Sequence, residues 1–139
     1  MALSIATWSP DGKLDGVALK SAGAITSDTT EDAVELGKGK YRLVLAITAI
    51  DVNATDDLYT VFVDANTRNA TSTWKRVTPK MCFGHSTATG DDASDSTDTY
   101  EIIVDNPYDY QLRVTTDVVG TVSTGINYTL TAYRLLSQH

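Results

Sequence analysis

Apolar and polar residues alternate with a period of two along most of this chain. Between Lys40 and Asp51 one parity is apolar and the other is mixed, which predicts a central strand with both faces largely covered. Residues 58–65 alternate in the same way after a short polar stretch, so we expect the two segments to form an antiparallel hairpin. Three further segments with this alternation lie in the C-terminal third, at residues 100–104, 110–115 and 126–133.

Weaker strands complete the expected fold. Three precede residue 40, and another follows residue 72 and is weakened at its end by Pro79, which cannot donate a ladder hydrogen bond. Their ranges are 3–8, 17–21, 33–36 and 73–81. Turn residues recur about every 8–12 residues, and no segment has a helical pattern. We therefore expect one domain over residues 1–139, an all-β sandwich of about eight antiparallel strands resembling a jelly roll.

The charge balance narrows the range of partners. The 139 residues include 11 basic and 18 acidic side chains, which gives a formal net charge of −7. Such a chain repels nucleic acid and anionic membranes unless it carries a local basic stripe. No segment approaches the roughly 20 apolar residues that span a bilayer, and the N-terminus lacks the pattern of a signal peptide. We expect a soluble protein, made in a cytoplasm, that binds neither nucleic acid nor membranes.

The longest polar segment runs from about residue 84 to residue 98. It is rich in aspartate and nearly free of apolar side chains, so it cannot bury itself and should form a surface loop, either mobile or ordered by a partner. Its aspartates are candidates for binding a divalent cation, but a solvated acidic loop is the more frequent explanation for such a run.

Weak candidates for a calcium site follow the strand that starts at residue 40. The spacing of Asp51, Asn53, Asp56 and Asp57 supplies oxygen ligands as the first half of a calcium loop does. However, Asp56 takes the place of the usual glycine, and Phe62 takes the place of the closing carboxylate. Turn capping by these side chains is the alternative, and we predict no metal and no cofactor.

Groups suited to catalysis are scarce. The histidines are His85 and the terminal His139, so no motif assembles a nucleophile, a base and a group that orients the base. The single cysteine, Cys82, directly follows an expected strand, and we predict a buried structural thiol there. These residue types favour a binding protein over an enzyme.

Aromatic side chains near cations suggest an interface. Trp74 directly precedes Lys75 and Arg76, and tryptophan and arginine often anchor protein interfaces. Trp8 and Tyr108 are further candidates for exposed aromatic anchors, so these five residues form the candidate interface. A sugar-stacking platform is the alternative use of the aromatic rings.

Several segments resemble a known class of proteins. They are GKYRLVLAITAID at residues 39–51, DLYTVFV at residues 57–63, and the strand and turn residues within 15–25 and 110–133. Together they resemble small structural proteins of tailed bacteriophages, of the capsid cement or decoration type. The resemblance covers most of the chain but consists of strand and turn residues rather than a catalytic motif.

The resemblance implies a β-sandwich or jelly roll that binds the outer surface of the phage head and stabilises contacts between major capsid subunits. The implied partners are the major capsid protein and further copies of the chain, most often in a trimer. The implied location is the capsid surface of the virion, after synthesis in the cytoplasm of the host bacterium. A carbohydrate-binding or receptor-binding module of a virion, and a head-completion or tail component, are the alternatives.

Overall fold

The computed structural model describes residues 16–51, 57–84, 98–120 and 122–135. These residues form eleven β-strands, and among them no helix is long and apolar enough to cross a membrane. The strands are β1 (Val17–Lys20), β2 (Ala24–Ile25), β3 (Thr29–Thr30), β4 (Val34–Glu35), β5 (Gly39–Ile50), β6 (Leu58–Thr67), β7 (Ala70–Arg76), β8 (Met81–Gly84), β9 (Thr99–Asn106), β10 (Gln111–Val119) and β11 (Ile126–Leu135).

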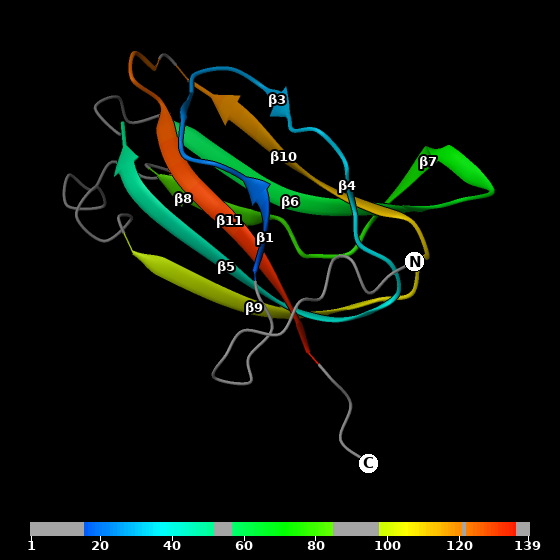
Figure 1. The fold of residues 1–139 in the computed structure, drawn as a ribbon. Coiled ribbons are helices and arrows are strands. Elements are labelled where there is room, and N and C mark those ends of the chain that lie inside the picture. Colours follow the sequence, from blue (N-terminus) through cyan, green and yellow to red (C-terminus); the bar gives the residue numbers. More distant parts are fainter. Residues whose placement is uncertain (1–15, 52–56, 85–97, 121, 136–139) are drawn as a thin grey trace.

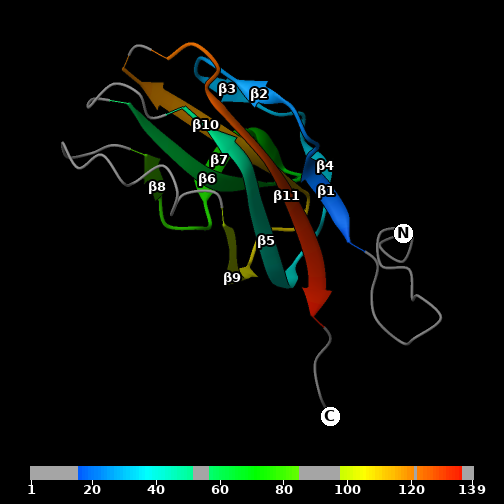
Figure 2. The same cartoon turned by 90° about the vertical axis from the view of Figure 1, so that its left-hand side faces the viewer.

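The strands form two antiparallel sheets that pack face to face (Figures 1 and 2). The β5 sheet has five strands in the order β1-β11-β5-β9, with β2 also paired to β11. The β6 sheet has six strands in the order β3-β10-β6-β7, with β4 paired to β10 and β8 paired to β6. From β4 to β6 and from β8 to β11, each connection crosses between the sheets, which is the connectivity of a jelly roll. The prediction of an all-β, jelly-roll-like sandwich is therefore confirmed, with short strands raising the number above eight.

The predicted hairpin between the segments at residues 40–51 and 58–65 is wrong. β5 pairs with β9 and β11, whereas β6 pairs with β7, β8 and β10. The alternation of side chains shows which face of a strand is buried but not which strand lies beside it, so a polar connection fits a crossover as well as a hairpin. The expected strand at 73–81 is divided into β7 and β8, with Pro79 in the connection between them. The expected strand at 3–8 lies outside the described residues.

The core contains the inward parity of the long strands. On β5 the buried side chains are Tyr41, Leu43, Leu45 and Ile47, each 4% exposed or less. The outer face of β5 is only partly covered, so the expectation that both faces are largely covered is wrong. At Thr48 the register with β11 shifts by one residue, and this bulge reverses the facing of the residues that follow it. This bulge explains why Ala49, the next residue of the apolar parity, is exposed.

Three fully buried tyrosines place hydroxyl groups between the sheets. Tyr41 donates to the carbonyl oxygen of Gly37 at 2.7 Å, and Tyr59 donates to that of Asp51 at 2.6 Å. The hydroxyl of Tyr128 lies 2.6 Å from that of Thr116 on the facing sheet. Burial raises the pKa of all three phenols, because an ionised phenolate loses its hydration in the core.

We expect the fold to lose stability steeply above about pH 10, the ordinary pKa of tyrosine. A phenol whose pKa is raised by folding contributes its full stability below the pKa of the unfolded chain, and this contribution is lost as pH rises toward the folded pKa. Base titration followed by circular dichroism and by tyrosinate absorbance checks this prediction: the last part of the absorbance should appear only as the β-sheet signal disappears. Complete ionisation with an intact sheet signal would contradict it.

Candidate binding surface

The outer face of the β6 sheet carries a mixed layer of aromatic and charged side chains. On β6 and β10, outward residues alternate with fully buried ones, and the outward side chains are partly buried. Arg113 of β10 pairs with Asp64 of β6, which in turn pairs with Arg76 of β7. Two residues along β10, Thr115 pairs with Phe62. These side chains of β10, β6 and β7 therefore share one face of the sheet.

Two cations lie over aromatic rings on this face. The guanidinium carbon of Arg113 is 3.9 Å from the centroid of the Trp74 ring, and the amine of Lys80 is 5.7 Å from that of Phe62. The first distance corresponds to a stacked cation–π contact that fixes the arginine plane against the indole. Together with Asp64 and Arg76, we call this set of six residues the central patch.

The charges of the central patch are poorly neutralised. It contains three cations, Arg76, Lys80 and Arg113, and one carboxylate, Asp64. In the described part of the chain, ion pairs join Arg42 to Glu101 and Arg68 to Glu35, and none involves the patch. Burial raises the pKa of the Asp64 carboxyl, and the nearby guanidinium groups of Arg113 and Arg76 oppose that rise. Asp64 is therefore less hydrated than a surface carboxylate.

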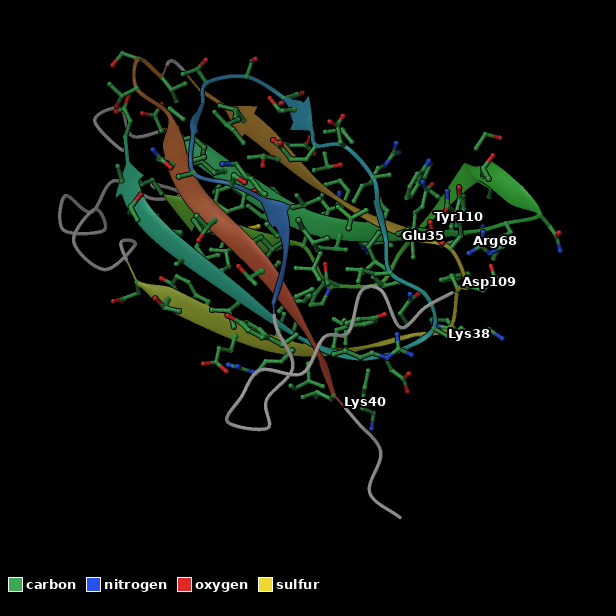
Figure 3. All side chains as sticks on the ribbon, viewed as in Figure 1. Glu35, Lys38, Lys40, Arg68, Asp109 and Tyr110 are labelled. Carbon is green, nitrogen blue, oxygen red and sulfur yellow. The ribbon has the colours of Figure 1, made fainter. Side chains whose placement is uncertain are left out.

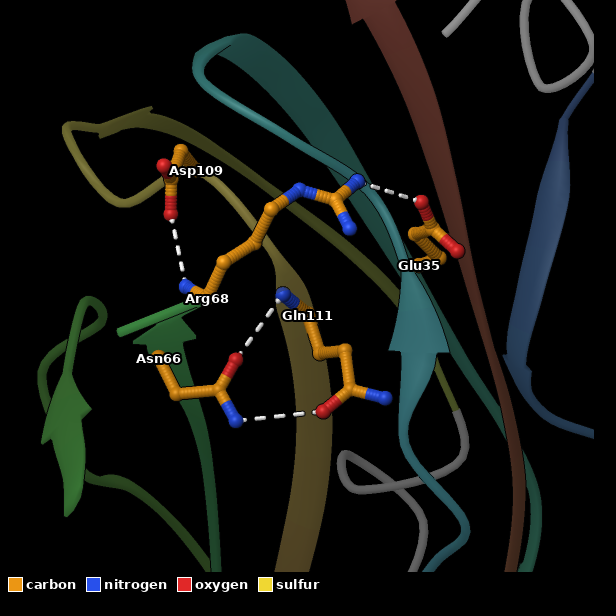
Figure 4. Close-up of polar contacts among 5 residues, drawn as sticks. All are labelled: Glu35, Asn66, Arg68, Asp109 and Gln111. Atoms are coloured by element: carbon orange, nitrogen blue, oxygen red, sulfur yellow. Dashed lines mark hydrogen bonds and ion pairs between the residues drawn. The ribbon is translucent and has the colours of Figure 1, made fainter. Parts of the chain in front are cut away.

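A polar cluster borders the same face near the β6–β7 turn (Figures 3 and 4). Asn66 and Gln111 exchange two hydrogen bonds, at 3.1 Å between their side chains and 3.0 Å from the Gln111 amide. Arg68 donates to Glu35 at 2.7 Å, and its amide donates to Asp109 at 3.0 Å. These contacts tie the turn to β4 and to the connection before β10.

The ion pair of this cluster contributes little to stability. The side chains of Arg68 and Glu35 are 59% and 58% exposed, so solvent screens the attraction between their charges. Arg68 also stacks on Tyr110, with 4.6 Å between the guanidinium carbon and the ring centroid. The cluster orients the base of the hairpin formed by β6 and β7, which projects from one end of the sandwich in Figure 1.

The structure brings together only part of the interface expected from the sequence. Trp74 and Arg76 lie on the outer face of the β6 sheet, whereas Lys75 is exposed on the opposite side of β7, because successive strand residues alternate. Tyr108 lies in the β9–β10 connection and packs partly buried against the core. Trp8 lies outside the described residues.

The interface expected from the sequence did not include four residues of the central patch: Lys80 in the β7–β8 connection, and the strand residues Phe62, Asp64 and Arg113. The outward parity of the strand residues was visible in the alternation, but their meeting depends on the pairing of β6 with β10, which are far apart in the chain. The sugar-platform alternative is weakened for Trp74, because Arg113 covers one face of its ring.

Asp51 acts as a turn cap in the described structure. Its Oδ2 accepts hydrogen bonds from the Ser123 amide at 2.8 Å, the Ser123 hydroxyl at 3.1 Å and the Thr124 amide at 3.0 Å. Asp57 is fully buried, and Asn53 and Asp56 lie outside the described residues, as does most of the Asp-rich segment (85–97). Within the described ranges, no three His, Cys, Asp or Glu side chains are grouped so that they could hold a metal ion.

The prediction of a buried thiol at Cys82 is wrong. Cys82 is exposed, because it lies on β8 opposite Thr60 and shares the outward parity of that residue. Its sulfur is 3.8 Å from the Thr60 hydroxyl. The neighbours Met81 and Phe83 take the inward positions and pack against the core. The two histidines, His85 and His139, lie outside the described residues.

The described surface thus combines aromatic rings in contact with cations and a partly desolvated carboxylate on one sheet face. This combination suits recognition of another macromolecule through shape and charge. Comparison with known proteins found no family model and no curated protein that matches this chain.

Proposed function

We propose that this chain is a phage capsid decoration protein that binds the outer surface of the head and stabilises contacts between major capsid subunits. The observation that carries the binding role is the central patch, in which Trp74 and Phe62 lie partly buried on an open sheet face beneath cations. Aromatic residues and arginine are enriched in the cores of protein interfaces. The resemblance of the strand segments to capsid cement proteins supports the choice of partner.

The architecture suits this role physically. A protein that binds only the assembled shell shifts the assembly equilibrium toward the shell, without a chemical reaction. The patch rests on a sheet whose inner face is fully buried, as at Val61, Val63 and Val114, so little conformational entropy is lost when it binds. Assembly into a homotrimer would present three patches together and increase the avidity for a repetitive surface. Mass measurement in solution tests the trimer, and a monomer at all concentrations would contradict it.

The binding role predicts that Trp74→Ala weakens association with phage heads by about 30-fold, the effect of losing a hot spot of about 2 kcal/mol. The measurement is co-sedimentation of the purified protein with heads that lack it. Tyr133→Ala is the matched control, because Tyr133 carries the same kind of stacked arginine, Arg42 at 4.7 Å, on the opposite sheet. Equal losses for both variants would contradict the assignment of the β6 face.

Electron microscopy of decorated heads separates the proposed function from its alternatives. We expect added density on the outer surface of the shell at junctions between capsid subunits. Density at the neck or tail would instead support a head-completion or tail component. Failure to bind any part of the virion, combined with binding to a glycan array, would support the carbohydrate-binding alternative.

A further inference from the structure

We propose that the central patch recognises carboxylate groups, and that its occupant is an acidic segment of the major capsid protein bound by Arg76 and Arg113. The identity of the partner rests on the proposed function. The preference for carboxylates follows from a comparison of the hydrogen bonds that the arginines of this chain donate. The juxtaposition that carries the inference is that of two arginines on one sheet face that donate no hydrogen bond to any described residue.

The five arginines divide into two groups. Arg42, Arg68 and Arg134 each donate side-chain hydrogen bonds within the chain, to Glu101, to Glu35, and to Tyr41 and the Lys38 carbonyl. Arg76 and Arg113 donate none to any described residue, and the buried Nε of Arg113 has no hydrogen-bond partner there. Both belong to the central patch. The terminal N–H groups of these arginines have no acceptor among the described residues, so they are available to an external one, and a carboxylate matches their planar donors in a bidentate manner.

The geometry favours two separate carboxylates. Arg113 and Arg76 pair with Asp64 from opposite sides, so their backbones lie two strand spacings apart, about 10 Å. Stacking on Trp74 holds the Arg113 guanidinium in place, which lowers the entropy lost on binding. Asp64 keeps the arginines from repelling each other but does not form an ion pair with either within the described structure. Two acidic side chains on one extended segment would fit this spacing.

The local charge opposes that of the whole chain. The patch carries three cations against one carboxylate, whereas the chain has a net charge of −7. The net negative charge disfavours non-specific contact with an acidic partner, so a local excess of cations helps to select the orientation in which the protein docks. Duplex DNA would require a longer basic stripe, and acidic residues such as Asp64 and Asp117 interrupt this face.

The test compares two double variants with the same change in charge. Arg76→Gln with Arg113→Gln removes the patch arginines, and Lys40→Gln with Arg42→Gln removes two cations from the outer face of the β5 sheet. Each is assayed by co-sedimentation with heads that lack the protein, untreated or with surface carboxylates amidated by carbodiimide and glycine methyl ester. Retention on immobilised poly-L-glutamate and on duplex DNA is measured in parallel. Arg76→Gln alone, at an exposed position, serves if the patch variant does not fold.

We expect the patch variant to lose about 100-fold in affinity for untreated heads and the control variant to lose less than threefold, because deleting charged partners at an interface costs several kcal/mol. Amidated heads should bind the parent as poorly as untreated heads bind the patch variant. If the parent binds heads and the patch variant binds equally well, the inference is wrong and the proposed function stands. If the parent does not bind heads, the proposed function fails, and retention on poly-L-glutamate that depends on the patch decides the inference. Patch-dependent retention on DNA alone would overturn it in favour of a nucleic-acid partner.

Discussion

Replacing Gly125 by alanine is expected to lower the free energy of unfolding by about 2–5 kcal/mol. Gly125 has a φ of +69°, and an added Cβ would lie 1.9 Å from the carbonyl oxygen of Ile25. The left-handed conformation costs a non-glycine residue about 1–2 kcal/mol, and relieving such an overlap costs about 1–3 kcal/mol more. The contact is with backbone, because β2 pairs with β11 immediately after this turn, so no flexible side chain can move aside.

Denaturant unfolding of the variant and of Gly23→Ala measures this difference. An added Cβ at Gly23 would meet no atom within 4 Å, and Gly23 is not among the glycines with positive φ. The control should therefore stay within about 0.5 kcal/mol of the parent. Equal stability of the two variants would show that β2 does not pack against the β10–β11 turn as described. Variants that test binding by the central patch should therefore leave Gly125 and the β10–β11 turn unchanged.

The inner faces of the long strands could be predicted from the sequence, because burial alternates locally with period two. Positions such as Leu43, Val61 and Leu130 are fully buried as the pattern indicated. The pairing of strands could not be predicted in this way, because it joins segments that are distant in the chain. The same limit explains the candidate site: Trp74 and Arg76 were noticeable as neighbours, but Arg113 joins them only through the pairing of β10 with β6.

Bulges are a second reason why the sequence pattern fails at particular residues. The register between β1 and β11 shifts between Ala18 and Lys20, so Leu19 and Lys20 are both buried. The amine of Lys20 donates to the carbonyl oxygens of Ser21, Gly23 and Tyr128 at 3.0, 2.9 and 2.8 Å. Regular alternation would have placed this lysine in solvent, and no local residue type marks the bulge.

Asp51→Ala is expected to lower the free energy of unfolding by about 3 kcal/mol, because it removes a buried carboxylate that accepts three hydrogen bonds from the β10–β11 turn. The Asp51 side chain accepts three hydrogen bonds from Ser123 and Thr124, and the residue is 5% exposed. A hydrogen bond to a charged group contributes about 1.5–3 kcal/mol. The expected loss is smaller than the sum of three such bonds, because Ser123 and Thr124 are exposed and can donate to water instead. Thermal and denaturant unfolding give the value, with Asp28→Ala as the control.

Among the described residues, Asp28 accepts one hydrogen bond, from the Val118 amide at 2.7 Å, at an exposed position, so its replacement should cost about 1 kcal/mol or less. The loss of stability in Asp51→Asn should fall between those of the two alanine variants, because an amide oxygen keeps part of the acceptor capacity but lacks the charge.

Unfolding experiments with and without calcium separate turn capping by Asp51 from calcium binding. If calcium raises the melting temperature of the parent and not of Asp51→Asn, Asp51 is a metal ligand rather than only a cap. If calcium and chelator leave the parent unchanged while Asp51→Ala is destabilised, the carboxylate serves the fold, holding the β10–β11 turn against the end of β5.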